Sequence, residues 1–180
     1  PGANSLFHCY DKNYHVRTSF SSYPFTKLLY RMKTYLKFRR LNKIVKSVPK
    51  SLLEVGCGNA SFLTYLESRW GNRCRFVGMD LSLEGTCLRP GSKVKLIAGD
   101  VETGEIKEHF DVVVMYQLLE HVADPLKVLG KIAKHLGPGG FLVGQVPNWE
   151  SPWRSFFPRH WAGLQVPRHM SFFSRESLKK

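Results

Sequence analysis

The chain has 180 residues, enough for one domain with a substantial core, and its 43% hydrophobic and 23% charged residues are ordinary for a globular protein. No apolar run approaches the roughly 20 residues that a membrane-spanning helix needs, and no segment resembles a signal peptide. The four cysteines form no Cys-x-x-Cys pair, which argues against a disulfide scaffold and indicates a reducing, cytoplasmic compartment. The first residue is proline and not methionine, which indicates a piece of a longer protein.

The net charge of +13 is distributed unevenly along the chain. Residues 12–53 hold eleven basic residues and no acid, residues 54–150 hold ten bases and twelve acids, and residues 151–180 hold six bases and one acid. Such basic flanks can meet an anionic substrate or lipid headgroups, so peripheral membrane contact stays open; they can also be a solvated helix face. No recognised nucleic-acid motif accompanies the charge, which argues against a nucleic-acid partner.

Residues 1–49 are predicted to form a loosely structured lead-in, up to residue 24, followed by a basic helical segment. Between residues 24 and 48, apolar residues recur at helical spacing and lysines and arginines fill the other positions. This pattern predicts one amphipathic helix or two. The helix either packs on the domain or, as an alternative, lies on a membrane surface.

Residues 50–148 alternate short apolar runs with helical segments. A helix is expected to begin near residues 59–60, and a second one runs from Asp124, a suitable capping residue, to Leu136 before Gly137-Pro138. The links after Asp80 and Asp100 are short, so their crossover helices should be small or degraded. The expected strands are Ser51–Val55, Arg75–Asp80, Val94–Ala98, Val112–Tyr116 and Phe141–Val146.

This alternation predicts the α/β class, with a Rossmann-like open sheet that is mostly parallel, helices on both faces and an N-terminal helical extension. Residues 149–180, rich in aromatic and basic side chains, are predicted to belong to the same domain and to cover an acceptor. A complete domain of this type continues through a further helix and two more strands, so the C-terminal strands are expected to be missing from this chain.

The sharpest local signal is the glycine turn Gly56-Cys57-Gly58, which joins the first strand to the first helix of the core. Glycine lets the backbone approach a ligand closely, although a tight turn without a ligand would look the same. Asp80 ends the second strand, where a carboxylate can accept both ribose hydroxyls, and Asp100 follows the third strand. Because parallel strands end at one edge of the sheet, these residues together favour a nucleoside site.

These motifs resemble, in order and spacing, those of class I S-adenosylmethionine-dependent methyltransferases, and most of all the group of ubiquinone-biosynthesis O-methyltransferases. The resemblance covers residues 50–147 strongly and 160–178 moderately. It rests on Glu54-Val55-Gly56-Cys57-Gly58, Asp80, Asp100, Phe110–Val122, Leu136–Phe141 and Trp161–Ser174.

The resemblance implies S-adenosylmethionine as cofactor and S-adenosylhomocysteine as product. Glu54 would orient the methionine amino end, and Gly56, Cys57 and Gly58 would pass under the methionine and ribose. Asp80, with the neighbouring Leu81, would hold the ribose. Asp100 and the Val101 amide would read the adenine, and Gln117 would place its carbonyl near the methionine ammonium. The third glycine of the family is Ala60 here, which implies a slightly altered turn.

Methyl transfer to a hydroxyl needs an aligned acceptor and benefits from a base with a pKa near neutrality. His121 and His169 are the candidate catalytic bases, although either can be a structural hydrogen-bonding residue. Glu120-His121 could be two metal ligands, but no further ligand follows at metal spacing, so no metal is expected. The sequence therefore predicts a methyltransferase acting on a small-molecule acceptor of aromatic or anionic character, with oxygen as the acceptor atom.

Two other functions share parts of this pattern. A nicotinamide-dependent dehydrogenase has the same plan, but its Gly-x-Gly-x-x-Gly fingerprint would need a glycine where this chain has Ser61. A degenerate methyltransferase fold could serve as a basic binding module on RNA or a membrane surface. The intact series of pocket residues argues against it.

Overall fold

The computed structural model describes residues 24–86, 88–161 and 163–179. Residues 1–23, which hold nearly all of the predicted lead-in, lie outside these ranges. Five strands form a single sheet in the order β3-β2-β1-β4-β5, and every neighbouring pair is parallel. The strands are β1 (Ser51–Val55), β2 (Arg75–Asp80), β3 (Lys95–Ala98), β4 (Phe110–Tyr116) and β5 (Leu136–Gln145). The predicted Rossmann-like open sheet is confirmed.

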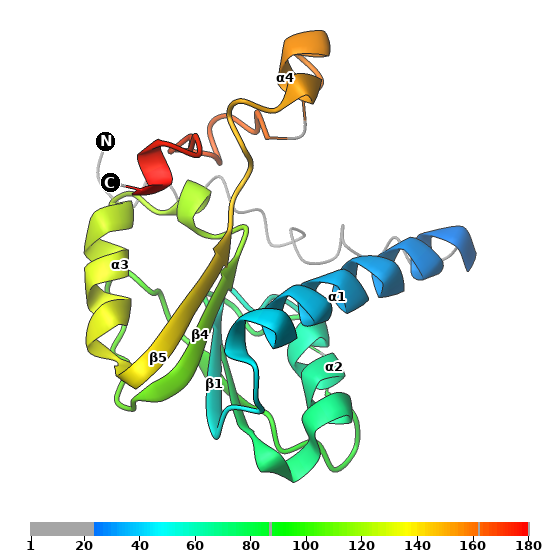
Figure 1. The fold of residues 1–180 in the computed structure, drawn as a ribbon, viewed down its shortest axis with the longest axis vertical. Helices are drawn as coiled ribbons and strands as arrows, with labels where there is room; N and C mark the ends of the chain where they lie inside the picture. The colour runs from blue at the N-terminus through cyan, green and yellow to red at the C-terminus, as the bar shows by residue number, and fades with distance from the viewer. Residues whose placement is uncertain (1–23, 87, 162, 180) are drawn as a thin grey trace.

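Helices lie against both faces of this sheet (Figure 1). The helices are α1 (Pro24–Val45), α2 (Ser61–Trp70), α3 (Pro125–Lys134) and the short α4 (Pro152–Phe156). Single 3₁₀ turns are η4 (Gly71–Arg73), η5 (Leu119–His121) and η6 (Ser177–Lys179). No helix among the described residues is both long and apolar enough to cross a membrane.

The hydrophobic core has two halves because alternate residues of each strand point to opposite faces. Leu52 and Phe76 pack with α1 and α2 on one face, whereas Leu53 and Val77 pack with α3 on the other. All five residues of β1 are buried, as expected for the central strand of a sheet covered on both faces.

Helix α1 departs from the predicted amphipathic segment. It is one continuous helix that ends at Val45, and its second half packs on the core, through the buried Leu41 and Val45 and the half-buried Phe38. Phe25 and Met32 are 69% and 52% exposed. The helix runs on past α2 (Figure 1), and its first turns keep exposed apolar side chains although the Tyr30 hydroxyl bonds that of Ser61 on α2.

Strand β5 begins five residues earlier than the predicted Phe141–Val146. The helix before it ends at Lys134, and Leu136 already pairs with Phe110 of β4. An irregularity in register follows, and the chain closes tightly onto β4 there, since a Cβ on Gly140 would lie 3.0 Å from the carbonyl oxygen of Asp111. Gly140, three residues after the predicted helix terminator at Gly137-Pro138, thus lets the strand approach its neighbour.

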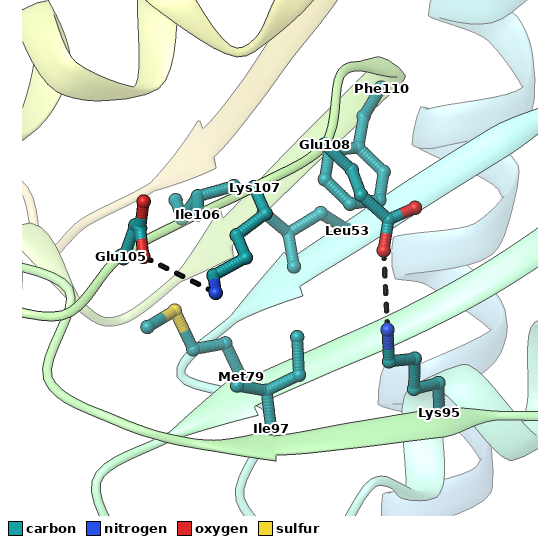
Figure 2. Close-up of a pocket in the computed structure, with 9 residues that line it drawn as sticks. All are labelled: Leu53, Met79, Lys95, Ile97, Glu105, Ile106, Lys107, Glu108 and Phe110. Carbon is teal, nitrogen blue, oxygen red and sulfur yellow. Dashed lines mark hydrogen bonds and ion pairs between the residues drawn. The ribbon is translucent and has the colours of Figure 1, made fainter.

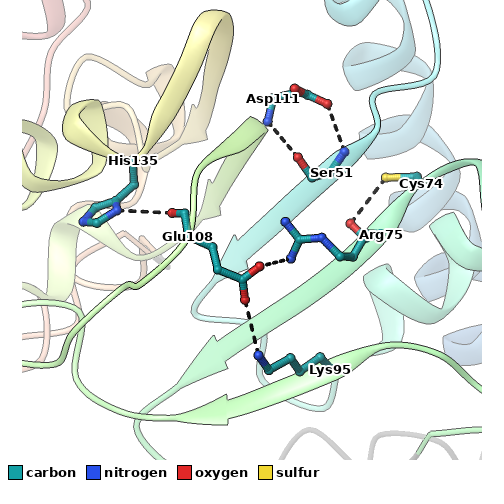
Figure 3. Close-up of polar contacts among 7 residues, drawn as sticks. All are labelled: Ser51, Cys74, Arg75, Lys95, Glu108, Asp111 and His135. Carbon is teal, nitrogen blue, oxygen red and sulfur yellow. Dashed lines mark hydrogen bonds and ion pairs between the residues drawn. The ribbon is translucent and has the colours of Figure 1, made fainter.

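The amino-terminal edge of the sheet is held by polar contacts (Figure 3). The Asp111 carboxylate accepts the backbone N–H groups of Lys50 and Ser51 at 2.7 and 3.0 Å. Glu108 pairs with Arg75 at 2.6 Å and with Lys95 at 3.3 Å. These contacts tie β1, β2, β3 and β4 together, so this edge is structural.

The links after β2 and β3 contain no helix among their described residues, as predicted. The link before β4 covers its sheet face thinly and leaves a hollow of about 260 Å³ (Figure 2). Apolar side chains such as Leu53, Ile97 and Phe110 line it, and a Glu105–Lys107 ion pair of 3.6 Å lies at its rim. None of the predicted cofactor residues lines this hollow, which makes it a gap in the cover of the sheet.

Candidate functional site

The predicted cofactor residues gather at the carboxyl-terminal edge of the sheet. Gly56–Gly58 follows β1, Asp80 ends β2, Asp100 follows β3 and Gln117 follows β4. Neighbouring parallel strands end at the same edge, which is where ligands of open α/β sheets bind. The topology therefore brings together residues that lie up to 61 positions apart in the chain.

The glycine turn is fixed by hydrogen bonds from its own backbone to β2. The N–H groups of Gly56 and Cys57 donate to the carbonyl oxygen of Met79 at 2.8 and 3.2 Å, and that of Gly58 donates to Oδ2 of Asp80 at 2.7 Å. Gly56 has a φ of 73°, and a Cβ there would lie 3.1 Å from Cδ1 of Leu118. Glycine is needed at this position for both reasons.

Ala60 occupies the third position of the turn in the left-handed conformation, with a φ of 58°. This conformation is the natural one for the glycine that the family carries here, and it costs a non-glycine residue about 1–2 kcal/mol. Ala60 is fully buried. The substitution therefore keeps the turn at a modest cost in strain.

Glu54 lies beneath the turn and is 4% exposed, and its Oε2 accepts no hydrogen bond from any described residue. Burial raises the pKa of Glu54 to about 8, although Lys37 of α1 acts in the opposite direction. Nζ of Lys37 lies 4.5 Å from the centre of the Tyr116 ring, and burial lowers its pKa. A buried carboxyl group with an unused oxygen is a suitable partner for a cationic ligand.

Lys37 was not among the predicted site residues. A signal for it exists in the sequence, because Lys37 lies four residues before the fully buried Leu41 and therefore on the same face of α1. Its ammonium group lies over the rings of Phe62 and Tyr116, and its charge acts on Glu54.

The residues expected near the adenine form a tight turn after β3. Oδ1 of Asp100 accepts the N–H of Glu102 at 2.8 Å, and Oδ2 accepts the hydroxyl of Thr103 at 3.3 Å. Val101 is buried, whereas Leu81, expected near the ribose, is 45% exposed.

Two further predicted residues have their positions fixed by neighbours. Gln117 has a φ of 57°, and both its backbone N–H and its side-chain amide donate to the carbonyl oxygen of Gln145, at 2.7 and 3.1 Å. Burial raises the pKa of the Cys57 thiol to about 12, which favours its protonated form at neutral pH.

The two candidate bases lie together, although 48 residues separate them in sequence. The rings of His121 and His169 meet edge to face with centroids 4.6 Å apart. Nδ1 of His121 lies 3.0 Å from the carbonyl oxygen of Arg168, and Nδ1 of His169 lies 2.7 Å from that of Gly163. Burial lowers the pKa of His121. In each ring a proton on Nδ1 would be donated to the carbonyl oxygen that faces it.

The C-terminal segment leaves the sheet after β5, forms α4 and returns to η5. The backbone N–H of Met170 donates to the carbonyl oxygen of Glu120 at 2.8 Å, and Phe173 bridges Asn148. At α4, the large side chains of Trp153 and Phe156 are 68% and 75% exposed. Figure 1 shows α4 projecting beyond the sheet.

This geometry can be compared with that of known proteins. The family model described as a methyltransferase domain matches residues 28–180. The chain belongs to this methyltransferase domain family.

Relatives of this methyltransferase domain include ubiquinone biosynthesis O-methyltransferases. Those of Aliivibrio fischeri (strain MJ11) and Vibrio cholerae serotype O1 (strain M66-2) are 33% and 34% identical over 121 residues, which cover 61% of this chain. The match covers 50% and 48% of those two proteins. The chain thus spans about half the length of the curated relatives it matches.

Solved structures share its fold. The plantazolicin methyltransferase BpumL superposes with a TM-score of 0.57 at 21% identity, covering 79% of this chain and 56% of its own. The N-methyltransferase NodS from Bradyrhizobium japonicum WM9 superposes with a TM-score of 0.55 at 21% identity, covering 78% and 70%. At these identities the likeness concerns the fold alone.

Proposed function

We propose that this protein transfers a methyl group from S-adenosylmethionine to an oxygen atom of a small-molecule acceptor and releases S-adenosylhomocysteine. The observation that carries the proposal is the hydrogen bond of 2.7 Å by which Asp80 holds the glycine turn beside buried Glu54. At one edge of the sheet, this arrangement lets a ligand approach the backbone of the glycine turn closely. It also offers the Asp80 carboxylate for a sugar and the Glu54 carboxyl group for a cation.

The residues present suit the cofactor. S-adenosylmethionine supplies an electrophilic methyl group on a sulfonium centre, and it carries two positive charges and one negative charge. Glu54 has an unused oxygen for the cationic end, and the space next to Gly58 is open, since a Cβ there would have no atom within 4 Å. The second oxygen of Asp80 would accept a ribose hydroxyl, while Asp100 and the Val101 amide would read the adenine.

Oxygen as the acceptor atom is supported by the relatives named O-methyltransferases, which are more similar in sequence than the N-methyltransferases that share the fold. It is also supported by the histidine pair, because hydroxyl acceptors benefit from a group that helps remove their proton. His121 lies in η5, just past the end of β4, and the ring of His169 contacts it, at the edge where the methyl group would be presented.

Residues 149–180 would cover the acceptor. Arg154 stacks on Trp149, with its guanidinium carbon 4.1 Å from the ring centre, so an aromatic and a cationic group face the same space. A planar or anionic acceptor suits such a surface. The exposed aromatic side chains of α4 would close on the acceptor, or rest on a membrane surface if the acceptor is lipid-soluble.

Titration calorimetry with S-adenosylmethionine and S-adenosylhomocysteine tests the cofactor assignment, and saturable binding of one equivalent is expected. The acceptor atom is tested by mass spectrometry after incubation with catechol and with 1,2-diaminobenzene, which present hydroxyl and amino groups on the same ring. A methyl ether from catechol supports the proposal. Absence of cofactor binding contradicts the activity as a whole, whereas methylation of the diamine alone contradicts only the choice of oxygen.

A further inference from the structure

Helix α1 carries two apolar faces on different parts of its length. Toward its end, Leu41 and Val45 are buried in the core that α1 shares with α2. Toward its start, five apolar side chains that are 37% to 69% exposed follow the spacing i, i+3, i+4, i+7 and i+11. These five side chains, called the outer stripe below, are Phe25, Leu28, Leu29, Met32 and Leu36.

The outer stripe points away from the domain. An α-helix turns by about 100° per residue, so Leu41 and Val45 lie about 160° around the axis of α1 from the centre of the stripe. The face that packs on the domain and the face that carries the stripe are therefore nearly opposite. The first turns of α1 also extend past α2 (Figure 1). The stripe can thus contact a flat surface while the second half of the helix keeps its place in the core.

All charged side chains of α1 are positive. Its 22 residues include seven lysines and arginines and no acid, and no acid occurs anywhere between residues 12 and 53. Arg39 and Lys43 are exposed and continue the line of the outer stripe at i+14 and i+18, while Lys33 and Arg40 lie along one side of it. Basic side chains that flank an apolar stripe are typical of helices that lie in a membrane interface.

The charge distinguishes between the partners that an apolar stripe can meet. A second copy of α1 would bring seven positive charges close to seven others, and this repulsion opposes contact. RNA would match the charge but not aliphatic side chains such as Leu28 and Met32. An anionic lipid surface matches both features, because its headgroups attract lysine and arginine and its acyl region accepts apolar side chains.

We propose that the outer stripe of α1 docks this protein on an anionic lipid surface. The helix would lie in the plane of the interface, with the stripe among the headgroups and the upper part of the acyl chains. Arg39 and Lys43 would reach the lipid phosphates, because long basic side chains can keep their charge in the polar layer. The domain would remain on the water side, joined to the docked helix through Leu41 and Val45. The inference is independent of methyl transfer, since it needs neither cofactor nor acceptor.

Vesicle flotation tests this proposal with the full chain and without cofactor. The protein should float with vesicles of phosphatidylcholine that contain about one third phosphatidylglycerol, and it should not float with phosphatidylcholine alone. Affinity for the anionic vesicles should fall by at least about tenfold when the salt concentration rises from about 0.05 to about 0.5 M, because salt screens exposed charges.

Two double variants separate the apolar contribution from the charged one. Leu28→Gln with Met32→Gln removes two apolar side chains of the outer stripe but keeps residues that favour a helix. Arg39→Gln with Lys43→Gln removes two charges at its end. Each double variant should weaken binding to anionic vesicles by about tenfold or more.

Helix α3 supplies the matched controls, because it packs on the opposite face of the sheet. Leu126→Gln changes an apolar side chain that is 77% exposed, and Lys127→Gln with Lys134→Gln removes two exposed charges. Both controls should bind anionic vesicles within about twofold of the wild type, since neither alters α1. Circular dichroism shows whether each variant is folded.

Several outcomes would overturn the inference. The first is a folded wild type that does not bind anionic vesicles, whether or not it binds single-stranded RNA. The second is a Leu28→Gln/Met32→Gln variant that binds vesicles as tightly as the wild type, because charge alone would then hold the protein. A dimer in sedimentation equilibrium that this variant abolishes would assign the outer stripe to a second copy. A lowered urea midpoint of the same variant would assign the stripe to a covering part of the chain itself.

Discussion

Oδ2 of Asp80 accepts the backbone N–H of Gly58 at 2.7 Å, so the residue that would bind the ribose also holds the turn over which the cofactor would lie. One carboxylate would thus have two tasks, and substitution can separate them.

Asp80→Ala removes both tasks and should weaken S-adenosylhomocysteine binding by about 100-fold, since bonds to a charged group are worth about 1.5–3 kcal/mol each. Asp80→Asn keeps an oxygen for the Gly58 N–H but loses the charge, and a loss of about tenfold is expected. Titration calorimetry measures both. Glu108→Gln, at the opposite edge, is the control and should change nothing. Wild-type affinity in Asp80→Asn would show that the carboxylate only holds the turn.

Affinity for S-adenosylmethionine should rise with pH up to about 8, the pKa to which burial raises Glu54. The protonated carboxyl group cannot pair with the cationic end of the ligand, so binding must release one proton below that pKa. Affinity therefore falls by about tenfold for each pH unit below 8. The charged groups facing Glu54 are Lys37 on α1 and Asp80 on β2, which shift its pKa in opposite directions.

Glu54→Gln is the control for this profile, because the amino group of the ligand titrates in a similar range. The difference between wild type and variant isolates the contribution of Glu54. Calorimetry in two buffers of different ionisation enthalpy counts the protons released. Equal proton release by both proteins would contradict the assignment of Glu54 to the cationic end.

Lys37→Met should move the pH profile of cofactor affinity to higher pH. The ammonium group favours the ionised form of Glu54, so its removal raises the pKa of Glu54 further. Methionine keeps an unbranched side chain of similar length beside the rings of Phe62 and Tyr116 but carries no charge. Lys33→Met, on a more distant turn of the same helix, is the matched control. A profile that does not move would mean that Lys37 does not act on Glu54.

His169→Ala should lower kcat by about 10²- to 10⁴-fold, the usual contribution of a group that assists proton removal. Affinity for S-adenosylhomocysteine should stay within about twofold of wild type, because His169 lies on the returning C-terminal segment and not on the glycine turn. Calorimetry and a turnover assay separate the two quantities. Equal losses in both would mean that the substitution disturbs the whole edge of the sheet.

The sheet was predictable because its signals are local. The glycine turn can be recognised because it follows the apolar run that ends in Glu54-Val55. Asp80 and Asp100 can be recognised because each stands at the end of an apolar run, at the spacing of successive strands. The start of β5 was missed because Leu136 continues the apolar stripe of the preceding helix, and pairing with Phe110 decides its conformation. Tertiary contact outweighs local pattern there.

Glycine turns and strand-end aspartates lie at fixed offsets along the chain, so the sequence predicts that they meet at one edge of the sheet. Their contacts with the cofactor stay a prediction. The spacing of Lys37 from Leu41 puts it on the packed face of α1, but its effect on Glu54 depends on how that helix docks. The meeting of His121 with His169 depends on how the C-terminal segment returns, which no spacing encodes. The sequence therefore named both histidines without indicating that they share one site.

Helix α1 offers a test of which of its turns belong to the core. Leu41 is fully buried between α1 and the sheet, whereas Leu28, three turns earlier, is 57% exposed. Leu41→Ala should lower the free energy of unfolding by about 2–5 kcal/mol because it leaves a cavity. Leu28→Ala should change it by no more than about 0.5 kcal/mol. Urea unfolding followed by circular dichroism measures both. A large loss in Leu28→Ala would mean that the first turns of α1 are covered in solution by a part of the protein outside the described residues.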